Sequence, residues 1–137
     1  MSQYWKNADE VAEAVSKVLT RCFEDPELRE IGENLGKTVV FNYSDPDAKI
    51  WVKSKDGKIE LGKGEAPLEP DVELSLSSDD GHRVWCNKLN LVVAIGRKKI
   101  KIKGNPAQLL KLAPMIKKAT PYYHDVLREM GKEAIIL

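Results

Sequence analysis

The architecture of this chain follows from one segment, Gly96-Arg97-Lys98-Lys99-Ile100-Lys101-Ile102-Lys103-Gly104-Asn105-Pro106. Lysines alternate with isoleucines at period two, which predicts a half-buried strand over Lys98–Lys103. Asn105 then supplies a helix N-cap, and Pro106 occupies the first helical position, where its missing N–H costs nothing. We therefore expect a strand with one apolar face, followed by a helix over Pro106–Lys117 that can cover this face.

Four more alternating segments lie upstream of this strand. They are Thr38–Tyr43, Lys49–Lys53, Lys58–Leu61 and Asp71–Ser77. The pair Asp56-Gly57, between the second and third of them, is the strongest short-range signal of a β-hairpin. Together the five segments predict a five-stranded, mostly antiparallel sheet with one apolar face.

Helical spacing dominates the rest of the chain. We expect helices from Asn7 to about Phe23, from Pro26 to Leu35, from Ser78 to about Asn87, over Pro106–Lys117, and over Pro121–Gly131. The segment Asn90–Ile95 is too short for its period to separate a helical turn from a buried strand. The fold class is α+β, with one face of the sheet covered by about five helices.

Length and composition set the frame for function. The chain has 137 residues, 42% of them hydrophobic and 31% charged, and we expect a single domain over 1–137. A formal net charge of +1 argues against a nucleic-acid binder that depends on counterion release. The N-terminal residues lack the apolar core of a signal peptide, and no run approaches about 18 apolar residues, so we expect a cytoplasmic protein.

Catalytic and metal-binding patterns are weak. His82 and Cys86 lie four residues apart on a predicted helix, but further zinc ligands and an orienting group for a nucleophilic thiol are both missing. We therefore interpret Cys22 and Cys86 as free thiols and His82 as a surface residue, and expect no enzyme activity, catalytic residue, metal or cofactor. A depressed pKa of the Cys86 thiol would revive a thiol chemistry.

The basic strand permits two interpretations. Lys99, Lys101 and Lys103 share one face, which fits a solvated strand whose lysines discourage edge-to-edge pairing. The same lysines could make transient contact with an anionic membrane surface.

The second half of the chain has more large apolar side chains than one sheet face needs. A generous core with a homodimer interface explains the surplus, and so does a cavity that takes an apolar guest.

Three motifs resemble the sterol carrier protein type 2 family of small lipid-binding domains. They are the strand Lys49-Ile50-Trp51-Val52-Lys53 with the Asp-Gly hairpin after it, the strand Pro70-Asp71-Val72-Glu73-Leu74-Ser75-Leu76-Ser77 before an acidic helix start, and Lys99-Ile100-Lys101-Ile102-Lys103-Gly104-Asn105. The resemblance covers Thr38 to Ile116 in the family's order. The family's helix before the last strand is replaced by Leu91-Val92-Val93-Ala94-Ile95, and Gly96 lies two residues further from Gly104 than usual. The C-terminus lacks a Ser-Lys-Leu peroxisomal address, which favours a stand-alone, prokaryotic-like member.

The resemblance implies non-enzymatic binding and carriage of a lipid, fatty acid or fatty acyl-CoA in an apolar tunnel between the sheet and the helices. We expect Pro121–Gly131 and Ile135–Leu137 to form a movable lid. The alternative is an accessory module on the same scaffold, with a closed tunnel and an apolar C-terminus that pairs with another subunit. The expected tunnel lining consists of Trp85, Leu89, Leu91, Val92, Ile95, Ile100, Ile102, Leu109, Leu112, Met115, Ile116, Tyr123 and Leu127.

Overall fold

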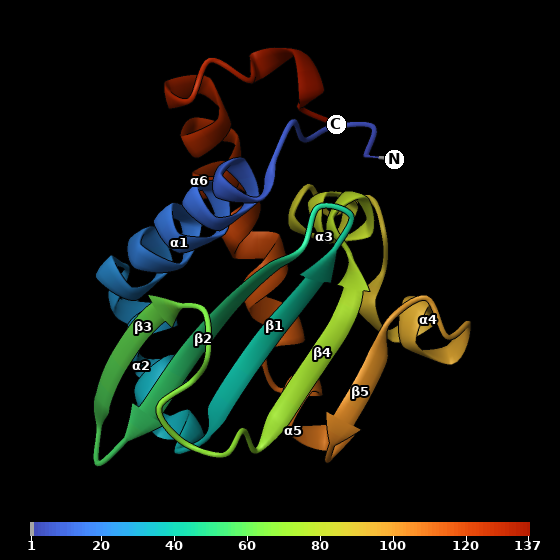
Figure 1. The fold of residues 1–137 in the computed structure, drawn as a ribbon. Helices are drawn as coiled ribbons and strands as arrows, with labels where there is room; N and C mark the ends of the chain where they lie inside the picture. Colours follow the sequence, from blue (N-terminus) through green and yellow to red (C-terminus); the bar gives the residue numbers. More distant parts are fainter. Residues whose placement is uncertain (1) are drawn as a thin grey trace.

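A mixed sheet with helices packed behind it organises the chain, and the computed structural model describes residues 2–137 (Figure 1). The strands are β1 Thr38–Ser44, β2 Ala48–Lys55, β3 Lys58–Lys63, β4 Val72–Ser77 and β5 Lys101–Gly104. The helices are α1 Ala8–Glu24, α2 Pro26–Leu35, α3 Ser78–Trp85, α4 Leu91–Gly96, α5 Pro106–Leu110, α6 Ala113–Glu129 and the 3-10 turn Glu133–Ile135. The predicted α+β class is confirmed.

The spatial order of the strands is β3-β2-β1-β4-β5. Neighbouring strands pair antiparallel except β1 and β4, which run parallel. The parallel pair arises because the β2–β3 hairpin intervenes and the chain then crosses back to the end of the sheet where β1 begins (Figure 1). The sheet is therefore mixed, although most of its pairs are antiparallel as predicted.

Residues with positive φ shape the chain at both edge strands of the sheet, β3 and β5. Asp56 and Gly57 both have positive φ, 53° and 73°, as the two-residue turn of a twisted hairpin requires. Gly104 ends β5 with a φ of 111°, and a Cβ atom built there would lie 2.2 Å from the carbonyl oxygen of Asp71. Only glycine therefore fits where the last residue of β5 passes the start of β4.

The strand predicted over Lys98–Lys103 is shorter than expected. Lys98 has a φ of 61°, and the backbone N–H groups of Lys99 and Ile100 both donate to the carbonyl of Ala94. These residues therefore complete the C-terminal end of α4, and pairing with β4 begins at Lys101. The open question over Asn90–Ile95 is also settled, because the Asn90 side chain caps a helix by accepting from the N–H of Val93.

The division between the last two helices was predicted wrongly. Pro114 has no N–H to donate to the Leu110 carbonyl, so α5 ends at Leu110 and Pro114 lies in the first turn of α6. Pro121, expected to begin a helix, lies inside α6. The hydroxyl of Thr120 donates to the carbonyls of Ile116 and Trp85 instead of capping a new helix, and apolar contacts on both sides of Pro121 keep the helix continuous.

The hydrophobic core has two parts. One part lies between the inner face of the sheet and the helices, and the other joins α1 to the C-terminal half of α6. In the second part Tyr123, Val126 and Leu127 are fully buried, together with Val11 and Val18 of α1. The two ends of the chain also lie close together above this contact (Figure 1).

Candidate ligand cavity

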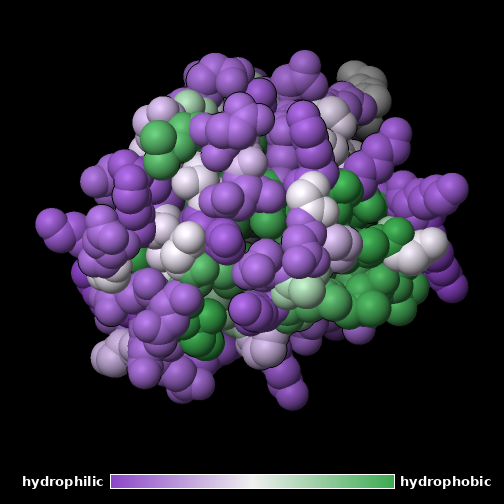
Figure 2. Space-filling model, turned by 90° about the horizontal axis from the view of Figure 1, so that it is seen from below, coloured by the Kyte–Doolittle hydropathy of each residue, from purple (hydrophilic) through white to green (hydrophobic). Residues whose placement is uncertain are grey.

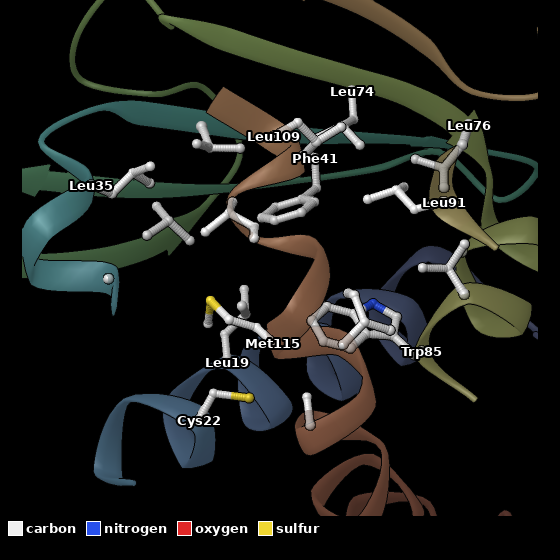
Figure 3. Close-up of a pocket in the computed structure, with 18 of the residues that line it drawn as sticks. Leu19, Cys22, Leu35, Phe41, Leu74, Leu76, Trp85, Leu91, Leu109 and Met115 are labelled. Carbon is white, nitrogen blue, oxygen red and sulfur yellow. The ribbon is translucent and has the colours of Figure 1, made fainter. Parts of the chain in front are cut away.

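An apolar cavity of about 80 Å³ lies between the sheet and the helices. Side chains from the strands converge on it from one side, and side chains from α1, α3, α5 and α6 converge from the other (Figure 3). The lining residues are Leu19, Cys22, Phe23, Gly32, Leu35, Val39, Phe41, Tyr43, Val52, Leu74, Leu76, Gly81, Val84, Trp85, Leu91, Leu109, Leu112, Met115, Ile116 and Ala119. The volume shows that the space between the layers is not packed solid, and Leu35, Phe41, Leu112 and Ile116 in its lining are partly accessible.

The few polar groups around the cavity carry no charge. The Trp85 indole N–H donates to the hydroxyl of Tyr43 at 3.3 Å, and burial raises the pKa of Tyr43 to about 12. Burial also raises the pKa of the Cys22 thiol to about 12. An uncharged and almost wholly apolar wall suits the hydrocarbon part of a ligand and disfavours a charged group.

Six of the thirteen residues expected to line a tunnel do line this cavity. They are Trp85, Leu91, Leu109, Leu112, Met115 and Ile116. All six belong to α3, α4, α5, the short link after α5 and the first half of α6, which form the helical wall.

The structure places the other seven elsewhere. Val92 is 55% exposed, because the face of α4 that is buried carries Leu91 and Ala94. Ile100 and Ile102 pack at the β5 edge of the core, beyond β4. Leu89 and Ile95 are partly buried against the core but do not line the cavity. Tyr123 and Leu127 lie deep in the contact with α1.

The burial of Tyr123 and Leu127 also shows that the prediction of a movable lid was wrong. The cavity is lined by Met115, Ile116 and Ala119, from the first half of α6, whereas the second half of the helix is core. The tail is held as well, because the Ile135 carbonyl lies 2.8 Å from Nε2 of His82. The structure therefore does not place Pro121–Gly131 or the tail over the cavity.

The sheet wall of the cavity was missed. Val39, Phe41 and Tyr43 of β1 and Leu74 and Leu76 of β4 all face it. The alternation of each strand already marked these residues as the inward set, so the signal was present in the sequence. The contributions of α1 and α2 could not be read this way, because every apolar stripe on a helix looks alike until its neighbour is known.

His82 is buried, whereas the sequence predicted a surface residue. Only 1% of its surface is accessible, Nδ1 lies 2.7 Å from the Tyr123 hydroxyl, and the Tyr4 ring lies 4.4 Å away between centroids. Cys86 Sγ lies 3.8 Å from Nε2 of His82, but burial raises the pKa of this thiol. The condition for thiol chemistry, a depressed pKa, is not met.

Among residues 2–137, no group of three or more His, Cys, Asp and Glu side chains could hold a metal ion. Within the same range, the helices are too short or too polar to cross a bilayer.

Comparison with known proteins identifies the family. A family model, the SCP-2 sterol transfer family, matches residues 15–117. The chain belongs to this family, which confirms the resemblance carried by its strand motifs. The bovine protein named hydroxysteroid dehydrogenase-like protein 2 is 38% identical over 79 residues, which is 56% of this chain and 18% of that protein. The chain thus spans less than a fifth of this relative's length.

Solved structures share the fold. The apo form of sterol carrier protein 2 from Yarrowia lipolytica aligns with a TM-score of 0.65 at 19% identity, over 87% of this chain and 98% of that one. Palmitated SCP2L2 from Aedes aegypti aligns with a TM-score of 0.54 at 19% identity, over 81% of this chain and 95% of that one.

Proposed function

We propose that this protein binds and carries, without catalysis, a lipid with a long hydrocarbon chain, such as a fatty acid or a fatty acyl-CoA. The hydrocarbon chain occupies the cavity between the sheet and the helices. The observation that carries the proposal is the almost wholly apolar, partly accessible lining in a chain of the SCP-2 sterol transfer family. Its fold relative from Aedes aegypti was solved in palmitated form, which supports a fatty-acid class of ligand.

The cavity must widen before an acyl chain can enter it. An empty apolar cavity of about 80 Å³ costs about 2 kcal/mol at roughly 24 cal/mol per Å³, which a folded domain tolerates. A cavity of about 150 Å³ holds one benzene molecule, so an acyl chain needs a wider space than the empty protein provides. Met115 and Leu112 are suited to move, because Met is unbranched and Leu112 belongs to the short link between two helices.

Burial of the chain supplies the affinity. Ten methylenes contribute about 8 kcal/mol gross at about 0.8 kcal/mol each. Association and the widening of the cavity subtract from this sum, which leaves micromolar retention at best.

Native mass spectrometry of protein purified from cells tests the proposal. A co-purified lipid mass, identified by lipidomics, supports a carrier. The alternative remains an accessory module with a closed cavity that dimerises through its apolar C-terminus, and a bare dimer would favour it. A bare monomer that also fails to take up added fatty acid contradicts both.

A matched pair of variants links the ligand to the cavity. Ala119→Leu places a larger side chain in the cavity wall, whereas Ala113→Leu makes the same change on the same helix outside it. We expect the first variant to lower fatty-acid affinity at least tenfold and the second to leave it within about twofold. Equal affinities in both variants would place the ligand elsewhere.

A further inference from the structure

The charges of this nearly neutral chain are strongly segregated. Residues 88–118 hold nine of its 22 Lys and Arg residues and none of its 21 Asp and Glu residues. The rest of the chain therefore carries 13 basic against 21 acidic residues, a net charge of −8. The basic segment contains α4, β5 and α5, so the excess positive charge lies at one edge of the sheet.

Most of these cations are free for a partner. Lys118 is paired with Glu27 and Asp25. Eight others are exposed and form no ion pair within residues 2–137. Two of them, Lys88 and Lys117, lie near the ends of the segment, and the other six lie from the end of α4 to the residue after α5: Arg97, Lys98, Lys99, Lys101, Lys103 and Lys111.

Apolar side chains lie exposed on the same elements. Val92 and Val93 on α4 are 55% and 45% exposed, and Leu110 at the end of α5 is 41% exposed. Figure 2 shows a broad hydrophobic area on the side of the molecule where α4 lies in Figure 1. Leu91 and Leu109, which line the cavity, precede these exposed residues in the same two short helices.

We propose that the α4–α5 edge, defined by Val92, Val93, Leu110 and the six free cations, docks on an anionic lipid bilayer. The valines and the leucine enter the boundary between headgroups and acyl chains, and the cations contact lipid phosphates and carboxylates. The long aliphatic stems of the lysines allow their ammonium groups to stay at headgroup level while the apolar tips insert. Pairing of this edge with the same edge of a second copy fits less well, because it would bring two sets of six unpaired cations together.

The docking proposal rests on the proposed function, because docking would serve a lipid carrier. The vesicle experiment measures docking alone and does not depend on lipid carriage. Docking through α4 and α5 would bring the two short helices next to the cavity into contact with lipid. The exposed residues do not line the cavity, so their substitution leaves binding of a dissolved fatty acid unchanged.

Vesicle flotation tests the docking. The full chain is mixed with vesicles of phosphatidylcholine alone, or of phosphatidylcholine with phosphatidylserine. We expect binding to the anionic vesicles only, weakened by added salt. Lys99→Glu/Lys101→Glu and, separately, Val92→Ser/Val93→Ser should each lower the affinity roughly tenfold or more.

Matched controls make the same changes elsewhere. Lys55→Glu/Lys58→Glu reverses two exposed lysines at the β2–β3 hairpin, and Leu68→Ser removes an exposed apolar side chain that is 44% accessible. Both should bind vesicles like the parent chain. The docking proposal would be overturned if the parent chain did not bind vesicles, or if the control variants lost binding equally. Self-association through this edge in place of vesicle binding would also overturn it. If the protein binds vesicles but neither retains a lipid from cells nor takes up added fatty acid, the docking proposal stands and the carrier function is overturned.

Discussion

His82 joins both ends of the chain to the helical layer. Its ring lies against Tyr4 and Trp5, and its two nitrogens contact the Tyr123 hydroxyl and the Ile135 carbonyl. A neutral ring satisfies both contacts, with Nε2–H donating to the carbonyl and Nδ1 accepting from the hydroxyl. Burial lowers the pKa of His82, and Arg83 and Lys132 lower it further, while the Ile135 contact and Asp79 raise it.

The lowered pKa of His82 predicts a pH dependence of stability. The unfolded chain, with a histidine pKa of about 6.5, takes up the proton first as the pH falls. The stabilising contribution is therefore complete above about pH 6.5 and is lost as the pH falls through the lower folded-state pKa. Urea unfolding at several pH values should show this loss, and His82→Gln should reduce it. His124→Gln is the control, because the pKa of His124 is also lowered and that variant should retain the part due to His82. An unchanged pH profile in His82→Gln would contradict the assignment.

Gly104 gives a second prediction at this scale. Gly104→Ala should destabilise the protein by more than about 1 kcal/mol, because the new Cβ would meet the Asp71 carbonyl and the φ of 111° disfavours alanine. Gly96→Ala is the matched control, since nothing lies within 4 Å of its Cβ position. The free energy of unfolding from chemical denaturation checks both. A Gly104→Ala variant as stable as the control would mean that β5 can leave β4 without cost.

At the scale of elements, α6 has two halves with different tasks. Its first half lines the cavity, and its second half packs on α1 as core. Continuity through Pro121 fixes the two halves relative to each other, so the second half cannot swing away without loss of core contacts.

Leu127→Ala tests this division. Leu127 is fully buried, so its truncation should cost about 2–5 kcal/mol of the free energy of unfolding. Leu110→Ala, at a position that is 41% exposed, should change stability by about 0.5 kcal/mol or less. A small effect of Leu127→Ala would restore the C-terminal helix as a movable lid.

For the whole molecule, the small cavity predicts that the empty protein stays folded. Removal of any bound lipid should leave the circular dichroism spectrum unchanged, since the empty cavity costs only about 2 kcal/mol. Added fatty acid at about 100 times its Kd should then stabilise the protein by about 2.7 kcal/mol. Thermal unfolding with and without ligand measures this shift. Collapse of the delipidated protein would show that the ligand is part of the core.

Local sequence signals predicted the elements that depend on local chemistry. The alternation of Val72, Leu74 and Leu76, the Asp56-Gly57 turn and the Asn105-Pro106 helix start all lie where they were expected. These features depend on neighbours a few residues away, and so the periods and turn residues suffice to specify them.

Only the tertiary structure decided which apolar residues face the space between the layers. Val92 and Tyr123 were both predicted to line the cavity, yet Val92 is 55% exposed and Tyr123 is fully buried away from the cavity. The burial of His82 and the continuity of α6 through Pro121 were likewise set by contacts with distant segments. A helix or strand by itself fixes only which of its side chains share a face. Whether that face meets the cavity, the core or solvent depends on the packing of elements far apart in the chain.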